Sequence, residues 1–323
     1  MGKRRSGENV HGVILLDKPV GLSSNQALQR VRRLLNARKG GHTGSLDPFA
    51  TGMLPICLGE ASKTAAYMLE ASKVYRAVAC LGKATSSGDI EGEVIREQEV
   101  PDLDVSQINR VLGSFLGEIL QIPPMYSALK HQGQPLYKLA RQGISVERKA
   151  RPVTIFRLGL VSWQSPYLSF EANCSKGTYI RTLAEDICTA LGCCGYLQEL
   201  RRLSVEPFSP AGMVSMAEIE QAVQQGRADE LLLPLDAGLL AWPALELDRE
   251  TAERFCHGNP VPGGQVCGKV RVFGTGGILG LGEVRQDGTL HPQRVFVMDP
   301  RSEKVGVLRN SLLRSHSIVK IGG

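Results

Sequence analysis

The chain has 323 residues, 42% of them hydrophobic and 22% charged, which predicts about two folded domains and excludes a disordered protein. It has no run of 18 apolar residues and no amino-terminal apolar segment with a cleavage site, so we expect a cytoplasmic protein without a membrane partner. The net charge of +6 lies in the ends, because residues 11–300 hold 30 basic and 30 acidic residues. Net charge alone therefore does not indicate RNA binding.

The first predicted element is a buried strand at residues 11–17, which enters a turn at residues 18–21. Ser23 followed by Gln26 fits a capping box, and Ala27, Val31 and Leu34 recur at helical spacing. A helix is therefore predicted directly before the next motif.

Two local clusters of basic residues favour RNA more than the net charge does. The first, within residues 30–39, contains no acid, and the second, within residues 122–151, contains only Glu147. Such clusters can neutralise phosphates, although a solvated surface is the alternative for each. Their members are Arg30, Arg32, Arg33, Arg38 and Lys39, and then Lys130, Lys138, Arg141, Arg148, Lys149 and Arg151.

Residues 40–55, which read GGHTGSLDPFATGMLP, are the most informative part of the sequence. Four glycines allow the backbone to approach a ligand closely. Pro48 fixes φ directly after Asp47 and biases Asp47 toward an extended conformation. The pattern predicts a rigid loop that aims the Asp47 carboxylate, and the alternative is a plain turn of ordinary turn residues.

The middle of the chain predicts strands that are often adjacent in sequence. A strand at residues 73–82 contains Tyr75 and ends in a turn at residues 86–89, and further strands are predicted at 152–162 and 166–174. Helices are predicted around Ile108, Val111 and Leu112 and from Thr178 onward. This order favours an α+β fold with a mixed, mainly antiparallel sheet flanked by helices.

From residue 244 the sequence changes to short, glycine-rich strands. Strands are predicted at residues 269–273, 278–284 and 294–298, with a hairpin turn at Asp287 and Gly288. We therefore predict four segments: a flexible basic amino terminus (1–10), a main domain (11–243), a small β domain (244–310) and a basic tail (311–323). A compact structural cap is the alternative to a ligand-binding role for the small domain.

The eight cysteines include no C-x-x-C pair and no His/Cys spacing of a zinc site. We expect most of them to be buried small hydrophobic residues in a reducing compartment, and we expect no structural metal.

Four stretches of the sequence resemble the TruB family of tRNA pseudouridine synthases. They are residues 17–24, residues 40–55, residues 73–76 with the turn at 88–89, and residues 174–183 continuing to 200–203. The resemblance covers most of residues 10–235 and implies a pseudouridine-synthase fold in the main domain. It further implies an isomerase that converts uridine 55 in the T-loop of tRNA to pseudouridine, without a cofactor or an obligate protein partner, as a monomer. The small β domain resembles the PUA-type RNA-binding module of some relatives.

The resemblance also assigns three catalytic residues. Asp47 is implied to act on the sugar, either as a nucleophile or as a base, and the sequence does not choose between them. Arg181 is implied to pair with Asp47 and to lower its pKa, whereas the alternative is a surface arginine on a helix. Tyr75 is implied to face the target base and to help remove the proton from carbon 5, whereas the alternative is a tyrosine packed in a sheet.

Three further residues are implied to bind the substrate. Tyr179 and Leu200 are implied to line the uracil pocket, and both also fit a plain core role. His42 is implied to fill the space that the flipped base leaves, whereas an idle, exposed histidine is the alternative. Lys18 and Pro19 resemble an element that supports the active-site loop.

Three other functions remain as alternatives. A guide-dependent ribosomal RNA pseudouridine synthase shares the catalytic loop, and a tRNA-folding protein shares the fold. A glycosidase is a third, because Asp89 and Glu91 supply further carboxylates, although we expect these two residues to be solvated or structural.

Overall fold

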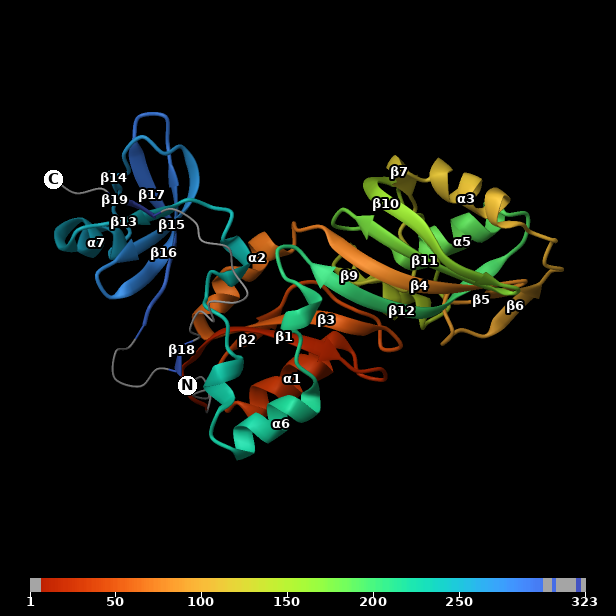
Figure 1. Cartoon of the computed structure of the whole chain (residues 1–323), viewed down its shortest axis with the longest axis horizontal. Helices are drawn as coiled ribbons and strands as arrows, with labels where there is room; N and C mark the ends of the chain where they lie inside the picture. The colour runs from red at the N-terminus through yellow and green to blue at the C-terminus, as the bar shows by residue number, and fades with distance from the viewer. Residues whose placement is uncertain (1–6, 299–303, 306–317, 321–323) are drawn as a thin grey trace.

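A computed structural model of the chain describes residues 7–298, 304–305 and 318–320. A nine-stranded sheet with its helices forms the larger part of the molecule, and a six-stranded sheet forms a smaller part at one end (Figure 1). The predicted α+β class, with a mainly antiparallel sheet and a small carboxyl-terminal β domain, is confirmed.

The large sheet has the strand order β18-β1-β3-β12-β4-β11-β10-β7, and β2 pairs with the outer part of β3. The pairs β1 with β18 and β3 with β12 are parallel, and the others are antiparallel. The predicted strands at residues 11–17, 73–82, 152–162 and 166–174 all belong to it. Its members are β1 (Val10–Lys18), β2 (Gly40–His42), β3 (Thr51–Leu58), β4 (Lys73–Leu81), β7 (Gly117–Gln121), β10 (Arg151–Gln164), β11 (Tyr167–Cys174), β12 (Gly195–Val205) and β18 (Lys304–Val305).

Two pairs of helices cover different parts of this sheet. The helices α3 (Val105–Ser114) and α5 (Ile180–Ala190) pack on β4, β10 and β12, and α1 (Ser24–Leu34) and α6 (Met216–Gln224) pack on β1, β2 and β3 (Figure 1). The predicted capping box of Ser23 and Gln26 starts α1, and Asp104 with Gln107 starts α3 in the same way. The short elements are α2 (Ala65–Met68), α4 (Leu136–Ala140), β5 (Lys83–Thr85), β6 (Val94–Glu97), β8 (Lys130–His131) and β9 (Gln134–Pro135).

The small domain contains the second sheet, in the order β14-β17-β16-β15-β13-β19, and the helix α7 (Arg249–Cys256). The predicted hairpin turn at Asp287 and Gly288 is confirmed. The last predicted strand was placed too late, because β17 starts at Thr289, directly after the turn, and Leu290 already pairs with Val284 of β16. The strands are β13 (Ala244–Glu246), β14 (Val261–Pro262), β15 (Gly268–Gly274), β16 (Gly277–Val284), β17 (Thr289–Val295) and β19 (Ile318–Lys320).

The expected flexible ends, residues 1–10 and 311–323, lie largely outside the described residues. Within the first segment, the Glu8 amide donates a hydrogen bond to the Asn36 carbonyl at 2.7 Å, just before β1. Within the second, Ile318–Lys320 forms β19 and pairs with β13.

The small domain is held against the large sheet by apolar and polar contacts. Leu281 and Phe296 belong to the same buried cluster as Val13 and Met53 of the large sheet. The Lys63 ammonium donates to the Val295 carbonyl at 2.7 Å. The two sheets therefore share part of their core at this junction.

Gly52 is the residue that lets β3 meet β12. It has φ of +99°, and a Cβ placed on it would lie 2.2 Å from the Arg202 carbonyl oxygen. Gly52 pairs with Arg202 in the parallel register of these two strands. A side chain at Gly52 would push β3, which follows the Asp47 loop, away from β12, which carries Arg202.

We predict that Gly52→Ala lowers the free energy of unfolding by at least about 2 kcal/mol. Alanine is strained at this positive φ, and its methyl group would collide with the Arg202 carbonyl oxygen. Denaturant unfolding measures this change. Gly41→Ala is the matched control, since a Cβ at Gly41 meets nothing within 4 Å. Equal stabilities for the two variants would contradict the prediction.

Candidate active site

The loop that carries Asp47 joins β2 to β3, and two side chains hold its backbone by hydrogen bonds. The Ser24 hydroxyl at the start of α1 donates to the Leu46 carbonyl at 3.0 Å and accepts from the Leu46 amide at 2.7 Å. The fully buried Lys18 ammonium donates to the Pro48 carbonyl at 3.3 Å. Asp47 is therefore fixed between two anchored neighbours, as the sequence predicts.

Lys18 supports the loop as a buried cation whose partners are carbonyl oxygens. Besides Pro48, its ammonium donates to the carbonyls of Pro19 at 2.9 Å and Leu22 at 2.6 Å. Burial lowers the pKa of Lys18 to about 8, because the charged form is the one that loses hydration. The expected supporting role of Lys18 is confirmed by these contacts.

The Arg181 guanidinium binds two carboxylates at once. Its Nε lies 3.2 Å from Oδ2 of Asp47, and its Nη1 lies 3.1 Å from Oδ2 of Asp89. The Arg181 and Asp89 side chains are 5% and 4% exposed, whereas Asp47 is 38% exposed. Asp89 thus forms the buried half of the network, and Asp47 is the carboxylate that a ligand can reach.

Backbone carbonyls complete the coordination of Arg181. Nη1 also donates to the Ser87 carbonyl at 3.0 Å, and Nη2 donates to the Tyr126 carbonyl at 2.5 Å. The Ser87 hydroxyl in turn donates to Asp89 Oδ1 at 2.5 Å. Since every arm of the guanidinium has a partner, its position is fixed without a ligand.

The net pKa of Asp47 differs from the prediction. The pairing with Arg181 lowers the pKa as expected, but desolvation raises it by more, and the nearby Asp89 charge raises it further. The net result is a pKa above the ordinary 3.8 rather than below it. Arg181 thus limits the effect of burial instead of producing an unusually strong acid.

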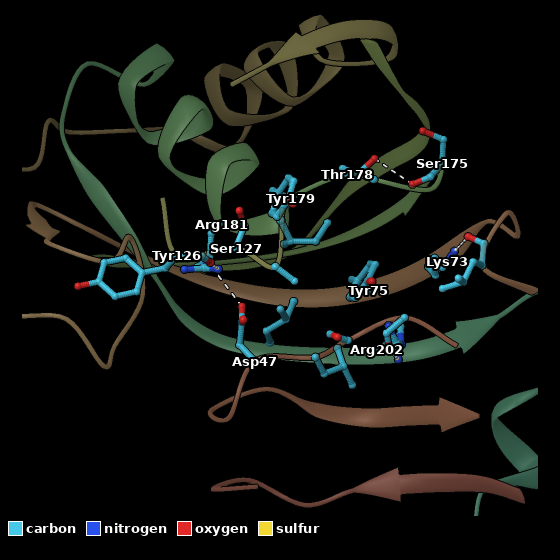
Figure 2. A pocket seen from close by; sticks show the side chains of 18 residues that line it. Asp47, Lys73, Tyr75, Tyr126, Ser127, Ser175, Thr178, Tyr179, Arg181 and Arg202 are labelled. Atoms are coloured by element: carbon cyan, nitrogen blue, oxygen red, sulfur yellow. Dashed lines mark hydrogen bonds and ion pairs between the residues drawn. The ribbon is translucent and has the colours of Figure 1, made fainter. Parts of the chain in front are cut away.

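A pocket of about 300 Å³ opens beside Asp47, large enough for a single base. Asp47, Tyr75, Tyr179, Arg181 and Leu200 all line it, so five of the six predicted site residues meet in one place (Figure 2). Tyr75 is 9% exposed and Leu200 is 8% exposed, so both are also core residues. Tyr75 and Leu200 therefore both pack in the core and line the pocket.

Tyr179 is positioned by its backbone. It precedes α5, and its amide donates to Gln121 Oε1 at 3.0 Å, while Gln121 Nε2 donates to the Tyr179 carbonyl at 3.3 Å. Gln121 is 2% exposed at the end of β7. The ring of Tyr179 is thereby held over the pocket from a fixed backbone (Figure 2).

His42, the sixth predicted residue, lies outside the pocket, in an adjoining groove of about 1180 Å³. Asp47 and Arg181 line the groove as well, so the pocket and the groove meet at the Asp47 carboxylate. Burial and, next, the Arg202 charge lower the pKa of His42, which favours the neutral imidazole. A neutral ring at this place suits stacking on bases.

The basic clusters relate to the groove in different ways. Arg141, from the second cluster, lines it, and other members of that cluster line a neighbouring hollow. In the first cluster, Arg30 pairs with Glu220 of α6 at 2.6 Å. The second cluster is therefore the better placed of the two to meet phosphates near the site.

Sequence reasoning missed three residues of the site. Asp89 was expected to be solvated or structural, and its burial on Arg181 supports the structural alternative, but its position in an acidic turn gave no sign of this pairing. Lys73 and Arg202 line the inner part of the pocket. The consecutive arginines at 201 and 202 could have indicated Arg202. Neighbouring residues of a strand point to opposite faces of the sheet, so one of two consecutive arginines points inward.

Six of the eight cysteines are buried, as expected. Across residues 7–298, no group of three His, Cys, Asp or Glu side chains is arranged to hold a metal ion. No helix in the described part of the chain is long and apolar enough to cross a bilayer.

The sequence matches three family descriptions in succession along the chain. They are TruB family pseudouridylate synthase (N terminal domain) over residues 32–180, tRNA pseudouridylate synthase B C-terminal domain over 181–240, and pseudouridine synthase II TruB, C-terminal, over 243–296. The chain is 51% identical over 299 residues to a protein of Pseudomonas fluorescens named tRNA pseudouridine synthase B, covering 91% of this chain and 98% of that protein. The chain belongs to the TruB family.

A second TruB relative, from Dechloromonas aromatica, carries the same name and is 50% identical over 294 residues, covering 90% of this chain and 97% of its own length. Two solved structures share the fold at lower identity. One is in a Cbf5-Nop10-Gar1 complex (24% identity, TM-score 0.70, 89% and 85% of the two chains covered). The other is in an H/ACA ribonucleoprotein bound to a substrate RNA containing 2′-deoxyuridine (22% identity, TM-score 0.69, 91% and 87% covered).

We predict that the Asp47 carboxyl titrates with a midpoint above 3.8, because desolvation outweighs the attraction of Arg181. Carboxyl-carbon NMR measures this midpoint, with Asp47→Asn used to assign the signal. Asp89→Asn should move the midpoint to lower pH, since it removes a negative charge that raises the pKa of Asp47. A midpoint at or below 3.8 in the unmodified protein would contradict this electrostatic account.

Proposed function

We propose that this TruB protein isomerises uridine to pseudouridine at position 55 in the T-loop of tRNA, with Asp47 as the essential catalytic residue. The observation that carries the proposal is a partly exposed carboxylate, held by a buried arginine, at the mouth of a base-sized pocket. Family membership supplies the reaction class, and the pocket supplies the residues.

The reaction breaks the bond from N1 of the base to C1′ of the ribose and joins C5 of the base to the same carbon. The proton on C5 is lost and N1 gains one, so substrate and product have the same composition. Asp47 acts as its carboxylate, either by attacking C1′ or by taking a proton from the sugar. The groove gives the sugar access to Asp47 in both routes, which leaves the two as alternatives.

Tyr75, Tyr179 and Leu200 form the binding site for the base. In this proposal the two aromatic rings and the leucine side chain enclose the detached uracil while it rotates. The Tyr75 phenol oxygen, as the phenolate, is the group within the pocket that takes the proton from C5. Arg181 holds Asp47 in position and contributes to catalysis through that carboxylate.

His42 compensates for base flipping. Extracting a stacked uridine from a folded loop costs a few kcal/mol. The neutral imidazole in the groove takes the vacated place and stacks on the bases that remain.

The proposed partner is the T-arm of tRNA, bound by shape and phosphate contacts along the groove that Arg141 lines. In this account the chain works in the cytoplasm as a monomer without a guide RNA. Residues 11–243 form the catalytic domain and residues 244–310 a PUA-like domain, with tails at either end.

The deciding experiment supplies the purified chain with a T-arm hairpin that carries tritium on C5 of the target uridine. Tritium should appear in water, because C5 loses its hydrogen only when the new bond forms. Asp47→Asn should lower the single-turnover rate by more than about 10³-fold, the scale of losing a covalent or general-base group, while hairpin binding survives.

Asp102→Asn is the matched control, since Asp102 is an exposed carboxylate away from the site. Its loss should change neither the single-turnover rate nor hairpin binding. Release only after a guide RNA is added would favour the guide-dependent alternative. Binding without any release would favour a tRNA-folding protein. Near-normal release by Asp47→Asn would refute the assignment of Asp47.

We predict that His42→Ala weakens productive binding more than it slows the chemical step, because His42 lies in the groove and not in the pocket. Single-turnover rates over a range of enzyme concentrations separate the two effects. The half-saturating concentration should rise, and the limiting rate should change little. A large loss in the limiting rate at unchanged half-saturation would contradict the stacking role.

A further inference from the structure

Arg202 is a buried cation with no carboxylate to neutralise it. It is 1% exposed, and within residues 7–298 no carboxylate lies in ion-pairing distance of its guanidinium. The other two buried arginines in the described part of the chain each have such a partner: Arg181 pairs with Asp89 at 3.1 Å and Arg271 with Asp236 at 2.8 Å. Since an unpaired buried charge costs several kcal/mol, Arg202 is suited to a negative charge that arises in the pocket.

The hydrogen bonds of Arg202 fix its guanidinium at the wall of the pocket. Nε donates to the Met53 carbonyl at 2.7 Å, and Nη2 donates to the Gly44 carbonyl at 3.3 Å. These carbonyls come from β3 and from the loop that leads to Asp47. Arg202 lines the pocket.

The sheet places Arg202 directly beside Tyr75. The two residues are cross-strand partners in the register of β12 with β4. Both side chains line the pocket, Tyr75 from β4 and Arg202 from β12. In Figure 2, Asp47 and Arg181 lie at one end of the pocket and Arg202 lies beyond Tyr75 toward the other.

Apart from Asp47, whose charge raises the pKa of Tyr75, the other titratable groups around this pair do not supply a negative charge there. Lys73 and Lys18 are cations, whereas Cys174 is a buried thiol whose pKa burial raises to about 11. His42 is favoured in its neutral form, and Asp47 is held by Arg181.

A tyrosine can take a proton from C5 only as the phenolate. Burial raises the pKa of Tyr75 above its ordinary 10, which makes the phenolate scarce at neutral pH, and the Arg202 charge opposes that rise. A fixed cation on the neighbouring strand therefore favours the phenolate of Tyr75, and with it the removal of the C5 proton.

We propose that Arg202 is a positioning residue that stabilises the phenolate of Tyr75 while it removes the proton from C5 of the rotated base. This inference rests on the proposed function. The phenol first gives its proton to solvent, and the phenolate then takes the proton from C5. The electron pair of the C5–H bond forms the C5–C6 double bond, and N1 takes up a proton, so no other reactant is needed.

A purely structural role makes a different prediction. Through Met53 and Gly44, Arg202 also ties β12 to the Asp47 loop, so its loss can disturb Asp47 instead of Tyr75. The two roles separate at the step they affect. Loss of the phenolate slows removal of the C5 proton, whereas a displaced loop slows breakage of the glycosidic bond.

The experiment compares Arg202→Met, Arg202→Lys and the control Arg201→Met on T-arm hairpins carrying hydrogen or deuterium at C5. Arg201 is the adjacent residue, and it pairs with Asp17 outside the pocket at 2.7 Å. Arg202→Met should slow the single-turnover rate by about 10²-fold or more. Its deuterium isotope effect should exceed that of the unmodified protein, Arg202→Lys should restore part of the rate, and Arg201→Met should behave as the unmodified protein.

A double-mutant cycle with Tyr75→Phe provides the second measurement and does not depend on the size of the starting isotope effect. If Arg202 acts through Tyr75, Arg202→Lys should cost rate in the unmodified background and nothing further in Tyr75→Phe. Equal losses in the two backgrounds would overturn the proposal in favour of the loop-holding role. Thermal melting and hairpin binding identify a variant that has not folded, and the lysine variant then carries the test.

An unmodified protein that releases no tritium from the hairpin would defeat the proposed function itself. A fully active protein whose Arg202 variants show additive losses would defeat only this inference.

Discussion

The shared guanidinium of Arg181 is the interaction on which the site depends. It joins a buried carboxylate, Asp89, to a reachable one, Asp47, and its remaining donors are bound to the backbone of Ser87 and Tyr126. Removal of either carboxylate leaves the buried Arg181 cation with one partner fewer, which lowers the stability of the folded protein. The arrangement also explains the pKa of Asp47, which desolvation raises while Arg181 limits the rise. The Asp47 carboxylate is thus more basic than that of an ordinary aspartate.

Three buried cations of the site, Lys18, Arg181 and Arg202, differ in whether carbonyl oxygens or carboxylates bind them. Lys18 is bound by three carbonyl oxygens and supports the Asp47 loop, whereas Arg181 is bound by carboxylates. Arg202 is bound by two carbonyls and lines the pocket without a carboxylate partner. Carbonyl dipoles hold a cation in place without cancelling its charge, so Arg202 retains a field that can act on Tyr75. The pocket consequently has a carboxylate and its arginine at one end and a second guanidinium beyond Tyr75 toward the other (Figure 2).

The large sheet converts distant stretches of sequence into one site. Asp47 comes from the turn before β3, Tyr75 from β4, Arg202 and Leu200 from β12, and Arg181 from the helix that precedes β12. The order β3-β12-β4 puts the strand with Arg202 between the other two, and Gly52 permits the parallel contact of β3 with β12. The fold class, most strands of the large sheet and the capped helix α1 followed from local patterns. The start of β17 did not, because pairing after a hairpin turn and not local composition set that boundary.

By itself, the sequence determined the rigid Asp47 loop, the elements around it and, through its resemblance to a family, the six residues proposed for the site. Glycine, proline and capping patterns act within a few residues, so they can be read locally. Only the tertiary structure decided that Asp89 is buried on Arg181, that desolvation overrides Arg181 at Asp47, and that Arg202 has no carboxylate partner. These properties depend on hydration and on charges that are close in space but far apart in sequence. Burial and electrostatic pairing are set by the assembled sheet, which no local pattern contains.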